Sequence, residues 1–472
     1  MFIHHQNQRT LALLSFLDRS HSVAKSGYNR WLVPPAALCI HLCIGQIYAY
    51  SVFNEPMTRI LGVTASTPED WKLTTLGWIF SIALFTLGAS AALFGKWLER
   101  VGPRMAMFIS AVCFCGGFLV AALGVYLHQI WIVYLGHGIL GGIGLGLGYI
   151  SPVSTLIKWF PDRPGLATGM AIMGFGGGAM IASPLSVSLM EWFSSANSVG
   201  VAETFIALGL IYFVVMMAGV FTVRVPQAGW HPSHYQPDAV KPKKLVTTAN
   251  VDADTAIRTP QFWFIFLVLM LNVTAGIGVL GQASVMIQEM FSADVVGADR
   301  AIGVAEAAGF VGLLSLFNML GRFFWSSTSD RIGRKPTYSI FFLLGAVLYV
   351  LIPTFGNMGS SVLFIGTFCI IISMYGGGFA TVPAYLKDMF GVMQVGAIHG
   401  RLLVAWSLAA IFGPVLINYL RAYQIETVGL PPAQAYSFTM YIMAGLLVLG
   451  FVFNMLIRPV RERYHYEESG KG

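Results

Sequence analysis

Long apolar runs alternate with short polar segments along most of the chain, from about residue 31 to residue 457. An α-helix needs about 20 predominantly apolar residues to cross the hydrocarbon of a bilayer, and the helix also satisfies its own backbone polar groups there. The pattern predicts an all-α membrane protein with twelve transmembrane helices. The predicted spans cover residues 31–53, 74–94, 105–127, 129–156, 165–190, 200–223, 260–288, 302–325, 336–356, 359–386, 396–420 and 434–457.

The composition indicates that lipid is the solvent for this chain. Of its 472 residues, 56% are hydrophobic and only 10% are charged, and the mean hydropathy is +0.70. Soluble domains carry about 25% charged residues, so a soluble fold could not bury this much apolar surface. The net charge of +7 comes from cations spread over short loops. This arrangement argues against nucleic-acid binding, which calls for one basic stripe.

Lysine and arginine are unequally divided between the two sets of loops. With both termini inside, the inner segments hold 22 of them and the outer loops hold Arg59, Lys72, Arg300 and Arg421. Cytoplasmic loops accumulate these residues, so we expect a multi-pass protein of the cell (cytoplasmic) membrane with both termini in the cytoplasm. Residues 1–30 are polar and lack the apolar core of a signal peptide.

Two cations, Arg322 and Arg401, fall within predicted spans, whereas none of the 21 acidic residues lies deep in one. An intramembrane arginine costs about 2.5–3.5 kcal/mol on insertion scales, which suggests that it has a role. Because no deep carboxylate can neutralise either cation, an anionic substrate is the simplest partner. A guanidinium can hold a carboxylate through two parallel hydrogen bonds.

The two halves of the chain match each other at a constant offset of 231 residues. We therefore expect two homologous six-helix bundles, at 31–224 and 259–457, joined by a cytoplasmic linker at 225–258 and flanked by cytoplasmic segments 1–30 and 458–472. Such repeats are typical of carriers that rock about a central substrate site. The matching pairs are Gly45 and Gly276, Arg100 and Arg331, Gly102 and Gly333, Arg104 and Lys335, Gly146 and Gly377, Pro152 and Pro383, Gly165 and Gly396, and Gly169 and Gly400.

A ten-residue motif occurs twice, at 95–104 and at 326–335. Both copies resemble the signature of the loop between the second and third spans of the major facilitator superfamily, with Glu99 in place of the usual aspartate. The resemblance implies the major facilitator fold, with two pseudo-symmetric six-helix bundles and alternating access. It also implies a gating role for the motif residues, which are Gly95, Glu99, Arg100, Gly102, Asp330, Arg331, Gly333 and Arg334.

Shorter motifs at 45–53, 158–166, 259–263 and 376–378 resemble the oxalate/formate antiporter family, whose members move small carboxylates. The resemblance covers about residues 30–460 and places Arg322 where an arginine of that family grips the substrate carboxylate. Oxalate carriers of the family also have a lysine in the eleventh span, where this chain has Trp406 and no lysine between 388 and 457. The departure favours a monocarboxylate such as formate, lactate or pyruvate over oxalate.

Other polar residues within the spans complete the candidate substrate site. Tyrosines can donate hydrogen bonds to carboxylate oxygens, or they can simply pack against neighbouring helices. Arg401 is a substrate ligand, a gate, or a brace for the inner loop beside it. A buried histidine can relay a proton or pack. The candidates are Tyr48, Tyr149, Tyr375, Gln46 and Asn272 for the substrate, and His41 and His137 for a proton.

No motif indicates an enzyme, a metal site or a cofactor. The five cysteines lie in apolar runs without metal-ligand spacing, and the glycine run 142–148 lacks the strand that precedes a nucleotide-binding loop. A single chain holds both halves, so a monomer can function. The sequence leaves open proton symport, anion exchange and uniport, a carrier of sugars or drugs, and a non-transporting nutrient sensor.

Overall fold

The computed structural model describes residues 16–233, 235, 245–247 and 249–466. Twelve helices within these ranges are long and apolar enough to cross a membrane, which confirms the number of predicted spans. The described residues contain two isolated β-bridges and no β-strand. The protein is therefore an all-α, multi-pass membrane protein.

Each half of the chain contributes six spans. In the first half the spans are η1–α3–η2–α4 (Arg30–Leu32, Val33–Ile44, Gly45–Phe53, Asn54–Met57), α5 (Leu73–Val101), α6 (Pro103–Tyr126), α7–η3–α8 (Ile130–Val133, Tyr134–Leu140, Gly141–Trp159), α9 (Pro164–Phe193) and α10 (Val201–Thr222). In the second half they are α12 (Pro260–Met290), α14 (Val304–Ile332), α15 (Arg334–Asn357), α16 (Ser361–Phe390), α17–α18–η5 (Val395–Leu402, Val404–Ala422, Tyr423–Thr427) and α19 (Pro432–Leu456). Short helices α2 (Arg19–Ser22), α11 (Ala253–Ala256) and α13 (Ala293–Val296) lie between or before the spans.

The two copies of the repeated motif are not loops, which corrects the sequence-based expectation. Helix α5 continues to Val101 and α14 to Ile332, and one glycine then reverses the chain before the next helix begins. Gly102 and Gly333 have φ values of 86° and 95°, a region that glycine adopts without steric cost. Hydropathy misses these helix ends because their charged turns extend beyond the hydrocarbon.

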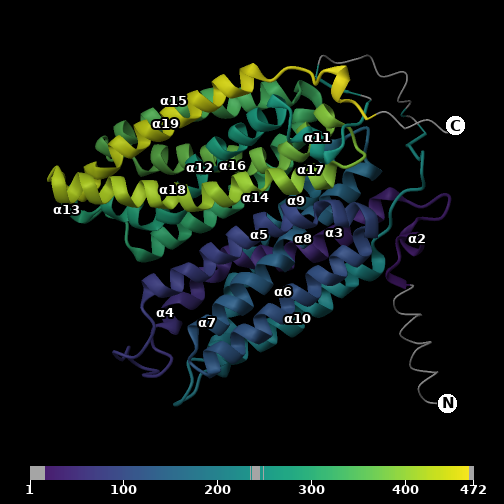
Figure 1. Ribbon diagram of the computed structural model, residues 1–472. Coiled ribbons are helices and arrows are strands. Elements are labelled where there is room, and N and C mark those ends of the chain that lie inside the picture. The colour runs from purple at the N-terminus through teal and green to yellow at the C-terminus, as the bar shows by residue number, and fades with distance from the viewer. Residues whose placement is uncertain (1–15, 234, 236–244, 248, 467–472) are drawn as a thin grey trace, which may run out of the picture.

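The two halves form two groups of helices that lie against each other (Figure 1). Helices α2, α11 and α17 lie at one end of the molecule, and Gly102 packs against Arg19 of α2 there; we call this end the linker side (Figure 1). The opposite end, which carries α4 and α13, is called the far side. Toward the far side the two groups of helices spread apart (Figure 1).

Contacts between the bundles reach from the linker side to about the middle of the helices. Thr168 Oγ1 donates to the Ala380 carbonyl at 2.6 Å, and Ser407 Oγ donates to the Leu84 carbonyl at 2.7 Å. A Cβ atom on Gly400 would lie only 2.1 Å from the Ala91 carbonyl oxygen. Small residues thus let the two bundles touch backbone to backbone, and the linker side is closely packed.

Candidate functional site

Arg322 lies on α14 at the interface of the two bundles, and its side chain is 1% exposed. Its Nε donates to Asn318 Oδ1 at 3.2 Å, and its Nη1 donates to the Ile172 carbonyl of α9 at 3.3 Å. Its Nη2 has no hydrogen-bond partner among the described residues. A buried cation with an unused donor and no carboxylate beside it is suited to hold an anion.

The space around this guanidinium is shaped by a glycine and two aromatic rings. A Cβ atom on Gly176 would lie 2.9 Å from Arg322 Nε, so only glycine leaves the side chain its present position. Arg322 Cζ lies 5.7 Å from the ring centre of Phe175 and 5.5 Å from that of Phe379, within cation–π range. The sequence analysis did not identify either phenylalanine. The internal repeat could have pointed to Phe175, because Phe175 corresponds to the candidate Trp406 at the offset of 231 residues.

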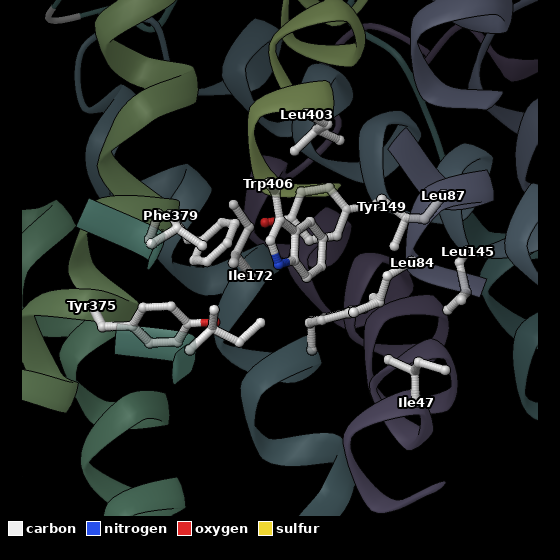
Figure 2. Packing of buried hydrophobic residues seen from close by; sticks show 14 of the residues in the cluster. Ile47, Leu84, Leu87, Leu145, Tyr149, Ile172, Tyr375, Phe379, Leu403 and Trp406 are labelled. Carbon is white, nitrogen blue, oxygen red and sulfur yellow. The ribbon is translucent and has the colours of Figure 1, made fainter. Parts of the chain in front are cut away.

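Six aromatic side chains form a continuous cluster beside Arg322. The ring centre of Trp406 lies 4.8 Å from that of Phe379 and 5.5 Å from that of Tyr149. Figure 2 shows Trp406 between these two rings, with the Tyr375 hydroxyl directed toward the middle of the group. We call this set the central aromatic cluster; its members are Tyr48, Tyr149, Phe175, Tyr375, Phe379 and Trp406.

The polar atoms of the central aromatic cluster are buried without partners. The hydroxyls of Tyr48, Tyr149 and Tyr375 and the indole nitrogen of Trp406 make no hydrogen bond of standard geometry to any described residue, although the Tyr48 and Tyr375 hydroxyls lie close enough to interact with each other. Most buried polar groups in proteins are hydrogen-bonded, so each exception needs an explanation. Together with Arg322 Nη2, these atoms form a set of unused donors around one cation. The structure thus brings Arg322 together with Tyr48, Tyr149, Tyr375 and Trp406, as the sequence analysis proposed.

Two histidines flank the Tyr149 ring. His41 Nδ1 and Nε2 face the carbonyls of Ala171 and Tyr149 at 2.5 and 3.2 Å. On the other bundle, the ring centre of His399 lies 5.9 Å from that of Tyr149, and both His399 ring nitrogens are buried without a partner. The sequence analysis did not single out His399. Nothing in its surroundings in the sequence shows that α17 turns this side chain toward the other bundle.

Three other candidates make no hydrogen bond to the cluster among the described residues, and one of them, Asn272, lines a small cavity together with Tyr375. The ring centre of His137, on η3, lies 4.4 Å from that of Tyr50 and 4.9 Å from that of Phe118, inside the first bundle. Gln46 is buried, and neither polar atom of its amide has a hydrogen-bond partner among the described residues. Asn272 on α12 borders the glycine run of α16, since a Cβ on Gly378 would meet its amide oxygen at 2.2 Å.

Arg401 is held by the linker rather than by the cluster. Its Nη2 contacts Asp254 Oδ1 at 2.6 Å, and its Nη1 donates to the Ala253 carbonyl of α11. The second carboxylate oxygen of Asp254 pairs with Lys96 at the end of α5. These two cations hold the pKa of the Asp254 carboxyl at about 2, below its ordinary value of 3.8. One carboxylate on the linker therefore joins both bundles.

Two further carboxylates bind the starts of helices across the bundle interface. Both oxygens of Asp330 accept hydrogen bonds from the backbone N–H groups of Gly165 and Leu166, each at 2.8 Å. Glu99 Oε1 accepts from the N–H of Gly396 at 3.1 Å. A helix N-terminus favours negative charge. Because these pairs are related by the offset of 231 residues, the contact is built twice, and we call the two copies the carboxylate latches.

The other motif residues support this region to different degrees. Arg334 pairs with Asp330 at 2.7 Å and with Asp388 at 3.0 Å. A Cβ atom on Gly95 would lie 2.7 Å from the Ala397 Cα, so this glycine allows the bundles to approach. Arg100 and Arg331 are exposed and make no hydrogen bond or ion pair with the described residues. Their positions leave them available to other partners on the linker side.

The family model described as Major Facilitator Superfamily matches residues 36–414 and 290–472. The chain belongs to the major facilitator superfamily. Its carboxylate latches are thus the superfamily motif in both copies, and its resemblance within the superfamily is to the oxalate/formate antiporters. The chain is 27% identical to the oxalate:formate antiporter of Oxalobacter formigenes, over 82% of this chain and 83% of that protein.

Other superfamily members resemble the chain more distantly. It is 23% identical to apicoplast pyruvate carrier 1 of Toxoplasma gondii, over 87% of each chain. It is also 23% identical to monocarboxylate transporter 2 of Rattus norvegicus, over 90% of this chain and 82% of that one. A solved structure of the transporter FucP in the outward conformation has a TM-score of 0.64 at 12% identity and covers 92% of this chain and 100% of its own. This structural likeness supports the fold.

Proposed function

We propose that this protein is a secondary active carrier of small organic anions, and that Arg322 holds the carboxylate. The observation that carries the proposal is the buried Arg322 guanidinium, whose Nη2 is unpartnered within a cluster of unused tyrosine and tryptophan donors. A cation without a counter-ion is costly away from water, and a bidentate carboxylate relieves that cost. Relatives named as an oxalate:formate antiporter, a pyruvate carrier and a monocarboxylate transporter support the substrate class.

The charge of the cluster favours a monocarboxylate such as formate, lactate or pyruvate over oxalate. Arg322 is in cation–π contact with Phe175 and Phe379, and Trp406 closes the opposite part of the cluster. An indole supplies one neutral donor and no positive charge. A second carboxylate would therefore be desolvated there without a cation to pair with.

Transport would proceed by alternating access between the two bundles, with the substrate site near the midplane. We infer that the linker side faces the cytoplasm of a cell membrane, with both termini inside, because the lysines and arginines of the loops gather there. The described conformation then corresponds to an outward-facing state with the carboxylate latches closed. Release to the cytoplasm would need both latches to break. The protein would work as a monomer, by proton symport or anion exchange.

Uptake of labelled formate, lactate, pyruvate and oxalate into liposomes containing the purified protein tests the proposal. We expect monocarboxylate uptake, and we expect Arg322→Ala to abolish it. Arg322→Lys keeps the positive charge but loses the planar guanidinium that can donate two parallel hydrogen bonds to a carboxylate. The kcat/KM for uptake should therefore fall by about tenfold or more. Arg461→Ala, in the exposed tail, is the matched control and should transport normally.

One result would contradict the proposal itself, and a second would contradict the preference for a monocarboxylate. Normal uptake by a correctly inserted Arg322→Ala variant would remove Arg322 from the substrate site. Oxalate uptake that requires internal formate or oxalate would show that the chain handles a dicarboxylate despite Trp406. A pH gradient and a trapped counter-anion, applied separately, distinguish proton symport from exchange.

A further inference from the structure

We propose that the linker side carries a second anion site, which binds a multivalent phosphorylated anion and is separate from the transport site. The site is a pocket of about 1070 Å³ between the two bundles and the linker. Its walls come from α2, α5, α8, the linker and the turn that follows α16. We call it the linker-side pocket; its cations are Arg19, Lys96, Arg100, Lys158 and Lys387.

The linker-side pocket has a strong excess of positive charge. Glu99 is the one acidic residue among the described residues that line it, and Glu99 already pairs with Lys158 at 2.7 Å. Lys96 is paired with Asp254. The Arg19 guanidinium donates to the Glu99 backbone carbonyl at 3.1 Å, which leaves its charge uncompensated by that contact. Arg100 has no ion pair with the described residues, so among these residues two guanidinium charges of the pocket have no carboxylate partner.

Both arginines line the linker-side pocket. A Cβ atom on Gly102 would lie 3.1 Å from Arg19 Cγ, so the Arg19 side chain packs against the glycine two residues after Arg100. Positive charges that line one pocket repel each other, and a phosphate dianion that accepts hydrogen bonds from guanidinium groups relieves that repulsion. Two arginines in the lining of one pocket therefore suit a ligand with at least two negative charges.

Neutral groups in the pocket also present donors. Asn250 Oδ1 accepts from the N–H groups of Val392 and Met393, each at 3.1 Å, so its NH₂ group is the part left for a ligand. Gln394 Oε1 likewise accepts from the Ala253 N–H at 2.9 Å. Because the two amide oxygens already accept hydrogen bonds, the NH₂ groups of these side chains suit an anion rich in oxygen atoms. The volume of the pocket is at the upper end of ordinary ligand sites and exceeds what a monocarboxylate needs.

The pocket is assembled from both bundles, which gives its ligand a defined effect. Lys96 and Lys158 belong to the first bundle, Lys387 to the second, and Asn250 to the linker. An anion that bridges these parts binds the conformation in which the linker side is closed and thereby favours it. Binding should then slow opening of the linker side and inhibit transport.

Binding of inorganic pyrophosphate to the full chain in neutral-lipid nanodiscs tests this inference, with sodium chloride at matched ionic strength as the baseline. We expect saturable binding by calorimetry and a higher unfolding midpoint. The double variant Arg19→Gln/Arg100→Gln should bind about tenfold more weakly or worse, because it loses charge-assisted hydrogen bonds. The control Arg461→Gln/Arg463→Gln removes the same charge from the tail and should bind as the unaltered protein does.

A second arm distinguishes a free anion from a lipid headgroup with the same phosphate chemistry. Nanodiscs that contain a phosphoinositide should leave pyrophosphate binding unchanged if the ligand is soluble, and should weaken it if the headgroup fills the pocket. Equal affinity of the unaltered protein and the Arg19→Gln/Arg100→Gln variant, or no binding above the chloride baseline, would overturn the inference. The readout is binding rather than flux, so this result is independent of whether carboxylate transport is confirmed.

Discussion

At the scale of single residues, the position of Arg322 depends on what surrounds it as much as on its own bonds. Asn318 and the Ile172 carbonyl orient the guanidinium, and Gly176 leaves room for it. The absence of a Cβ at residue 176 is therefore a structural requirement of the site. A carboxylate can be held in bidentate fashion only if the guanidinium plane is fixed, since a misplacement of about 1 Å can cost about 100-fold in rate.

Gly176→Ala should raise the KM for the transported anion by about tenfold, because the new methyl displaces Arg322 from its present orientation. Initial rates of uptake in liposomes measure this effect. Gly366→Ala, at a position in α16 where a Cβ meets nothing within 4 Å, is the matched control and should leave KM unchanged. An unchanged KM for Gly176→Ala would mean that Arg322 does not need this orientation.

At the scale of helices, the carboxylate latches join the end of one helix to the start of another across the bundle interface. Asp330 and Glu99 sit at the ends of α14 and α5 and bind the starts of α9 and α17 in the opposite bundle. A hydrogen bond to a charged group contributes about 1.5–3 kcal/mol, and a helix N-terminus adds a favourable dipole term. The latches can thus hold one of two conformations without contributing to the stability of either bundle alone.

Asp330→Asn should shift the population toward the state in which the linker side is open. The amide keeps the shape of the carboxylate but loses its charge and one of its two acceptors. Spin labels at Tyr126→Cys and Val362→Cys, exposed positions at the far-side ends of α6 and α16, report the change as a shorter distance in a cysteine-free background. An unaltered distance distribution would show that the Asp330 contacts do not hold the linker side closed.

Asp254→Asn should have a much smaller effect on the same distance. The Asp254 side chain is 51% exposed, and exposed ion pairs contribute about 0–1 kcal/mol. Its folded pKa of about 2 lies below the unfolded value of 3.8, so its ion pairs contribute above that value and are lost only as pH falls through about 2. Lowering the pH from 8 to 5 should therefore leave this contact in place. A change in the label distance of the unaltered protein over that pH range, as large as the change caused by Asp254→Asn, would contradict this assignment.

At the scale of the whole molecule, the two bundles close against each other through glycines. Gly400 packs against the Ala91 carbonyl, and its repeat partner Gly169 packs against Ser326. A glycine therefore allows the close approach of the bundles at both of these helix crossings. The closed linker side creates the partly buried latches and the linker-side pocket. The same closure leaves the far side spread apart (Figure 1), as a carrier with one closed side requires.

Gly400→Val should prevent the linker side from closing, because a Cβ there would lie 2.1 Å from a backbone oxygen that cannot move aside alone. The expected result is a population with the short far-side label distance and a loss of uptake. Gly445→Val, on α19 where a Cβ meets nothing within 4 Å, should retain both the distance and the uptake. Normal uptake by Gly400→Val would show that the close approach is dispensable.

The sequence by itself determined the twelve spans and the two matching halves, and it singled out Arg322 as a cation within a span. Spans can be predicted because hydropathy and charge depend on neighbouring residues in the sequence, and the repeat can be found by aligning the two halves of the chain. Only the tertiary structure placed Phe175 and Phe379 beside that arginine, placed His399 beside Tyr149, and paired Arg401 with Asp254 of the linker. These contacts join residues far apart in the chain, and they depend on how each helix is rotated and on where it ends. Packing between helices fixes both, and no local pattern encodes them.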